Sequence, residues 1–194
     1  MTTSRTTWVV LLLVPFAMSA ILVLSNPVSH VAAGEYNGAT DFDYFYSGAE
    51  LFAQGRYEEL YDPEVFPQLL DRTEPKLWYA YSPMYARAWG PLTRFSIDSA
   101  WVIWTLLSAV LIALAAALNA AKWRATAAIL AIASFPAAMN LQLGQNAAVS
   151  AVLIGIAHAM IIRGRPIGAG LALGLMFKPQ LAIGVGLCWQ RRTS

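Results

Sequence analysis

Cysteine, histidine and charged residues are scarce in this sequence of 194 residues. The single cysteine, Cys188, cannot form an internal disulfide, and two histidines leave few ligands for a zinc site. Only 12% of the residues are charged while 58% are hydrophobic, which excludes an ordinary soluble domain. A disordered chain is excluded as well, because 12% of the residues are aromatic. The composition therefore predicts one integral membrane domain, with no metal site and no cofactor.

The acidic residues are confined to one segment of the chain. Ten of the eleven lie between Glu35 and Glu74, so residues 25–77 carry a formal net charge of −7 and the remainder carries +9. The basic residues of the remainder flank apolar runs, as the positive-inside rule describes for membrane proteins. Because no basic stripe interleaved with aromatic residues occurs, the sequence predicts no binding to nucleic acid.

Apolar runs predict a multi-pass protein of a bacterial inner membrane, with its N-terminus in the cytoplasm. The predicted spans are residues 8–24, 99–121, 125–143 and 147–162, and residues 25–98 form an outer loop with interfacial helices. A cleaved signal peptide, ending at Val31-Ala32-Ala33, is the alternative interpretation of the first run. Either interpretation places residues 25–77 outside the membrane.

The last apolar segment is interrupted by Lys178-Pro179. Proline breaks the hydrogen-bond ladder of a helix, and a lysine in the middle of a bilayer costs about 3 kcal/mol. The sequence therefore predicts two short half-helices, residues 166–177 and 179–189, that meet at a cavity on the outer side. The Lys178 side chain can snorkel to the interface, or it can hold a phosphate group.

Residues 41–54 of the outer loop predict an amphipathic helix that lies in the membrane interface. Its apolar positions are Phe42, Phe45, Tyr46, Ala49, Phe52 and Ala53. Asp41 and Asp43 occupy its first turn, where acidic residues cap a helix and favour its dipole. Alternatively, a carboxylate at this boundary acts as a general base, with its pKa raised by the neighbouring aromatic rings.

Other polar and aromatic residues supply further candidates for a binding site. Gln145 and Asn146 are typical of a turn and a helix cap, and they can also hydrogen-bond a polar substrate. Tyr81 is typical of an interface anchor, although aromatic rings also stack on sugars. His158 is predicted to pack within a helix.

Two blocks of short motifs stand out from the rest of the chain. The first comprises Asp41-Phe42-x-x-Phe45-Tyr46-x-x-Ala49, Gly55, Tyr61-Asp62-Pro63, Tyr81-x-Pro83 and Gly90-Pro91-Leu92. The second comprises Gly144-Gln145-Asn146, Arg165-Pro166, Ala169-Gly170, Gly174-Leu175 and Lys178-Pro179-Gln180. Together, in this order and spacing, they resemble glycosyltransferase family 87, whose members are polytopic membrane enzymes of the glycosyltransferase C type.

The resemblance implies an all-α fold, a polytopic transmembrane helical bundle with an extracytoplasmic first loop that carries an amphipathic helix. It implies inverting transfer of a sugar, often mannose, from a polyprenyl-phosphate donor to a hydroxyl of a lipid or glycan acceptor. Asp41 matches the position of the family's base, and Asp43 is a secondary candidate. The expected substrate-binding residues are Lys178, Gln145, Asn146, Tyr46 and Tyr81.

The chain departs from the family pattern in two respects. Ser82 stands where the family usually has proline, and family members are commonly much longer. The chain thus resembles the N-terminal half of such an enzyme: a truncated reading frame, a degenerate remnant, or one part of a split protein whose second chain supplies the missing helices. Two alternatives remain open: a non-catalytic membrane scaffold or inactive fragment, and a transporter, since broken helices with an intramembrane lysine occur there too.

Overall fold

The computed structural model describes residues 21, 25, 28–34, 40–69, 79–120 and 122–176. Within these ranges all regular structure is helical, which confirms the all-α prediction. The chain divides into two compact units. We call residues 30–105 with 143–145 the loop unit, and residues 106–142 with those that follow 145 the helix unit.

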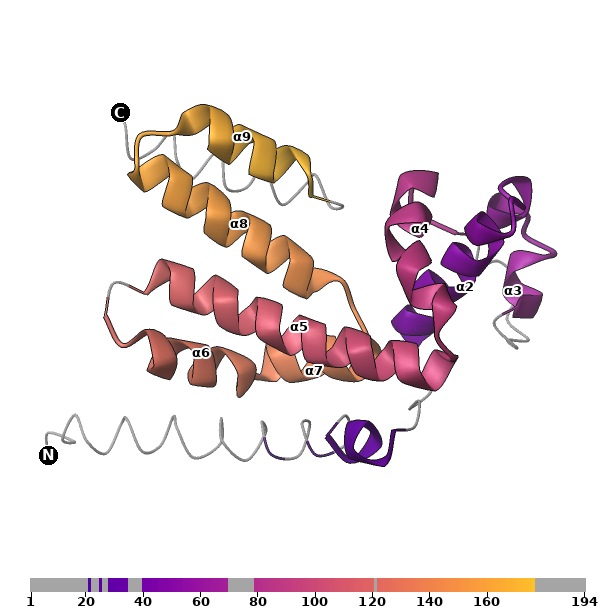
Figure 1. Ribbon diagram of the computed structural model, residues 1–194, viewed down its shortest axis with the longest axis horizontal. Coiled ribbons are helices and arrows are strands. Elements are labelled where there is room, and N and C mark those ends of the chain that lie inside the picture. Colours follow the sequence, from indigo (N-terminus) through magenta and orange to yellow (C-terminus); the bar gives the residue numbers. More distant parts are fainter. Residues whose placement is uncertain are drawn as a thin grey trace, which may run out of the picture. The chain divides into compact units, whose positions relative to one another are not determined.

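The loop unit is built around α2 (Thr40–Ala53), which lies against α4 (Pro83–Trp89) and the short helix η2 (Gly90–Arg94) (Figure 1). The apolar positions of α2 that face these elements, Phe42, Phe45, Tyr46 and Ala49, are buried. The aromatic face of α2 therefore forms the core of the loop unit, and the position of this helix in a membrane interface stays a prediction. The helices that cover it come from the apolar stretch after residue 78, which sequence periodicity alone could not pair with residues 41–54.

Two short helices complete the loop unit. They are η1 (Glu58–Tyr61) and α3 (Phe66–Leu69). Asp62 joins them, because its carboxylate accepts hydrogen bonds from the backbone N–H groups of Glu64 at 2.8 Å and Val65 at 3.3 Å. An exposed ion pair between Arg56 and Glu59 precedes this turn.

The helix unit contains the longest helix, α5 (Ile97–Asn119), which begins in the loop unit, and α6 (Arg124–Ile132), α7 (Phe135–Leu143), α8 (Ala147–Ile162) and α9 (Pro166–Gly174). Helix α9 folds back along α8 (Figure 1). The buried contact between them is made of alanines, Ala157 on one side and Ala169 and Ala172 on the other. Helices α5 and α8 are also joined, since the Asn119 Oδ1 lies 2.5 Å from the His158 Nδ1.

The predicted span of residues 125–143 is broken in the structure. Helices α6 and α7 meet at an angle of 56°, and Ser134 lies at the break. Its hydroxyl donates to the carbonyl of Ala131 at 2.7 Å and accepts from the N–H of Ala137 at 3.3 Å. Pro136 has no N–H to continue the ladder, so Ser134 ends one helix and caps the next.

One helix of the described part of the chain meets the length and composition required of a membrane span. Helix α5 is long and apolar enough to cross a bilayer, and α6 with α7 would make a second span if the bent pair acts as one. Helix α8 has the bounds predicted for a helix, but its 16 residues fall short of a typical span. The multi-pass bundle therefore stays a prediction, as does the first span, most of which lies outside the described residues.

Candidate functional site

Asp41 and Asp43 lie in the first turn of α2, as the sequence predicts. Both side chains are partly exposed, whereas Phe42 between them is fully buried. No hydrogen bond or ion pair joins the Asp41 carboxylate to another residue that the structure describes. The Asp41 side chain is thus partly accessible, while the buried ring of Phe42 anchors the start of α2.

The turn formed by residues 143–145 lies against the start of α2, and both belong to the loop unit. Gly144 has a φ of +65°, and a Cβ placed on it would lie 2.5 Å from the Cβ of Phe42 and 3.3 Å from its Cα and N. Only glycine allows this approach without displacement of the backbone. The contact brings Gln145 to the acidic end of α2, although about a hundred residues separate them in the sequence.

Trp104 holds this turn in place. Its indole Nε1–H is buried and donates to the carbonyl of Gly144 at 3.1 Å. The rings of Trp104 and Trp89 have centroids 4.1 Å apart, and Trp89 lies 5.8 Å from Phe42. A continuous set of packed rings therefore connects the 143–145 turn to the helix that carries the two acids.

The predicted binding residues Tyr46 and Tyr81 are both parts of this aromatic core. The Tyr46 hydroxyl donates to the carbonyl of Phe95 at 2.7 Å, which fixes α2 to the end of η2. Tyr81 is half-buried, stacks on Tyr85 with a centroid distance of 4.9 Å, and accepts a hydrogen bond from Tyr61 at its carbonyl. Tyr81 thus keeps part of its ring accessible, whereas Tyr46 is engaged in packing.

The other two predicted binding residues are not brought to the acids by anything that the structure describes. Asn146 is the N-cap residue of α8, is 1% exposed, and accepts the Val149 N–H at its backbone carbonyl. Its side-chain Nδ2 has no hydrogen-bond partner among the described residues. Lys178 lies outside the described residues, and so does the predicted half-helix 179–189.

Burial perturbs ionisable groups of the loop unit. It raises the pKa of the Glu50 carboxyl on α2, and it raises the pKa of the Tyr79 hydroxyl, which has no hydrogen-bond partner in the described part of the chain. The described residues contain no group of three or more histidine, cysteine, aspartate or glutamate side chains that could hold a metal ion.

Sequence patterns missed the two residues that assemble the site, Trp104 and Gly144. Gly144 carries a turn signal, but nothing in its neighbourhood indicates contact with Phe42. Trp104 lies inside a long apolar run, where an indole is indistinguishable from any other core or lipid-facing ring.

Comparison with known proteins identifies the family. The family model of glycosyltransferase family 87 matches residues 79–193, more than half of the chain. The matched range contains Tyr81, Gln145 and Asn146 and begins after the two acids of α2. No curated protein and no solved structure matches the chain. The family that the motifs suggested is confirmed, and the chain belongs to glycosyltransferase family 87.

Proposed function

We propose that this chain takes part in transfer of a sugar from a polyprenyl-phosphate donor to an acceptor hydroxyl at the outer face of a bacterial inner membrane. The family supplies the reaction class, glycosyl transfer. The donor, the acceptor and the catalytic base are our assignments, with mannose as the first sugar to test. The observation that supports the proposal is the contact of Gly144, the neighbour of Gln145, with Phe42, which lies between the two acids of α2.

Asp41 is the general base in this proposal. Its carboxylate accepts the proton of the acceptor hydroxyl while that oxygen attacks the anomeric carbon from the face opposite the phosphate, so the configuration is inverted. The bond from the anomeric carbon to the phosphate oxygen breaks, and polyprenyl phosphate leaves with the electron pair. Lys178 is assigned to the phosphate, where a cation stabilises the charge that develops. No metal or nucleotide is needed for this step.

The remaining predicted residues divide into two roles. Gln145 and Tyr81 are assigned to the sugar, since Gln145 lies at the acidic end of α2 and the Tyr81 ring is partly accessible. Tyr46 is a positioning residue, because its hydroxyl is engaged with Phe95. Asn146 is assigned to the acceptor or the donor only if its buried amide becomes accessible when substrate binds.

The test is transfer by the purified chain, together with its membrane partners, from radiolabelled polyprenyl-phosphate mannose to a membrane lipid extract. Asp41→Asn should lower the rate by about 10²- to 10⁴-fold while leaving thermal unfolding unchanged. Glu64→Gln, an exposed acid of the same unit, is the matched control and should keep full activity. Asp43→Asn is measured beside them.

Three outcomes would contradict the assignment. Transfer by Asp41→Asn at the wild-type rate would remove Asp41 from the base role, and loss in Asp43→Asn alone would give that role to Asp43. Failure of the wild-type protein with mannose and with other polyprenyl-phosphate sugars would contradict the donor class.

A further inference from the structure

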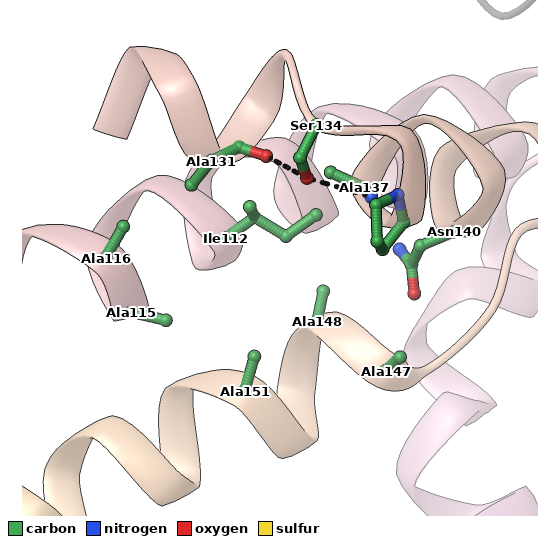
Figure 2. Close-up of a pocket in the computed structure, with 11 residues that line it drawn as sticks. Ile112, Ala115, Ala116, Ala131, Ser134, Ala137, Asn140, Ala147, Ala148 and Ala151 are labelled. Carbon is green, nitrogen blue, oxygen red and sulfur yellow. Dashed lines mark hydrogen bonds between the residues drawn. The ribbon is translucent and has the colours of Figure 1, made fainter. Parts of the chain in front are cut away.

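A cavity of about 280 Å³ that is open to its surroundings lies in the helix unit, between α5, the bent pair α6 and α7, and α8. Figure 2 shows the three walls, with Ile112 on α5, Ala131 and Asn140 on the bent pair, and Ala148 on α8. Seven of the eleven lining residues are alanines, and the wall is almost entirely apolar. Small side chains on all three walls leave the space open where larger ones would close it.

One lining residue is out of keeping with this apolar wall. Asn140 is 4% exposed, and neither its Nδ2 nor its Oδ1 has a hydrogen-bond partner among the residues that the structure describes. Ser134, the other polar lining residue, is fully engaged with the backbone of α6 and α7. A buried amide without partners is costly, and most buried side-chain amides in proteins are paired.

The Asn140 amide lies beside the cavity, with its Nδ2 and Oδ1 covered in this structure. In Figure 2 it points from α7 toward the start of α8, where Ala147 and Ala148 line the space. The last torsion of an asparagine side chain is soft, so the amide can turn toward a bound group without moving the helix. The residue thus offers one donor and one acceptor to whatever occupies the cavity.

We propose that this cavity binds a single aliphatic chain that ends in a hydroxyl group, as a lipid alcohol of the membrane does. A hydroxyl both donates and accepts, so it satisfies the two orphaned atoms of Asn140 together. An apolar cavity of about 150 Å³ holds one benzene molecule, so this cavity accommodates a chain of roughly eleven carbons. Helix α5, which forms one wall, is membrane-spanning by length and composition, so the surroundings supply such chains.

Two other occupants fit the observations less well. A water molecule needs two to four polar partners, and Asn140 is the one lining side chain with unpaired polar atoms in the described part of the chain. A packed helix is about 10 Å wide and rises about 5.4 Å per turn, so a single turn already occupies more volume than this cavity offers. The site does not depend on the proposed glycosyl transfer, and its test does not use that activity.

The experiment uses the full chain in nanodiscs of phosphatidylcholine, a lipid without a hydroxyl group. The probes are 1-decanol with a photoactivatable diazirine in mid-chain and its methyl ether, which accepts but does not donate. After irradiation, mass spectrometry measures the labelling of peptides from α7 and α8. The alcohol should label the wild type about fivefold more than the ether, the selectivity expected of one hydrogen bond.

Three variants test where the aliphatic chain binds. Asn140→Leu should abolish the preference for the alcohol, and Ala151→Leu should reduce labelling by both probes because its side chain fills the cavity. Ala159→Leu, on the same helix but outside the cavity, is the control and should change neither. Equal labelling of the wild type by alcohol and ether, or full labelling of Ala151→Leu, would overturn the proposal. If Asn140→Leu does not fold, the comparison of the two probes on the wild type decides alone.

Discussion

Replacement of Gly144 by alanine should destabilise the loop unit more than the same change at any open glycine. Gly144 has a φ of +65°, and the added Cβ would lie 2.5 Å from the Cβ of Phe42, closer than real Cβ contacts allow. Gly55 is the matched control, because it belongs to the same unit, has a φ of +75° and has nothing within 4 Å of an added Cβ. Both substitutions introduce the left-handed strain, and only Gly144→Ala introduces the clash.

The size of the effect follows from these two contributions. A left-handed alanine costs about 1–2 kcal/mol relative to glycine. Phe42 is fully buried and packs on Tyr46 and Trp89, so it cannot move away freely, and overpacking of this kind costs about 1–3 kcal/mol. Gly144→Ala should therefore lower the free energy of unfolding of the loop unit by about 2–5 kcal/mol, and Gly55→Ala by about 1–2 kcal/mol.

The assay is unfolding in detergent monitored by tryptophan fluorescence, since Trp89 and Trp104 lie in the affected core. Glycosyl transfer is measured on the same samples at a temperature where both variants are folded. Gly144→Ala should lose activity there, because the displaced turn carries Gln145 with it. Equal loss of stability in Gly144→Ala and Gly55→Ala would refute the packing of the 143–145 turn on α2.

Three further predictions concern single interactions. Tyr46→Phe removes the hydrogen bond to the Phe95 carbonyl, so thermal unfolding should show a loss of about 1 kcal/mol in stability. An unchanged stability would contradict that hydrogen bond. Burial raises the pKa of the Glu50 carboxyl, so ionisation of this group disfavours the folded state. Stability should fall as pH rises from the unfolded-state pKa near 4.5 through the higher folded-state pKa, and Glu50→Gln should remove that fall in unfolding curves measured across this range. Asn119→Leu breaks the contact with His158 between α5 and α8, so unfolding in detergent should show a loss of about 1 kcal/mol in the free energy of unfolding. Adding His158→Leu to this variant should cause no further loss, because the contact is already broken.

The helices were largely predictable because each follows a local pattern. The apolar run before Lys122 predicted α5, and the spacing of aromatic residues after Asp41 predicted α2 within one residue at each end. The bend at Ser134 was not predicted, although Pro136 marks it, because proline near the end of an apolar run is also tolerated within a kinked span. The destination of the aromatic face of α2 was not predictable, since a membrane and a protein core attract the same side chains.

The candidate site was only half predictable for a related reason. Asp41 and Gln145 were expected on one side of the membrane from topology, which follows from charge and hydropathy. Their approach depends on Gly144 and Phe42, and no local pattern encodes a contact over such a sequence separation. Lys178 had a chemical signal, a charge within an apolar stretch, but it lies outside the described residues, so its role stays a prediction.

The packing of Phe42 bears on the choice between the two acids of α2. Successive residues of a helix are turned by about 100°, so Asp41 and Asp43 lie on opposite flanks of the buried Phe42 and about 200° apart. The buried ring of Phe42 packs against the ring of Trp89, and this contact fixes the orientation of α2 about its own axis. The helix therefore cannot rotate to bring both carboxylates to one substrate. The two carboxylates therefore leave α2 in different directions. With Asp41 as the proposed base, this separation leads us to expect that Asp41→Asn and Asp43→Asn differ in activity while resembling each other in stability.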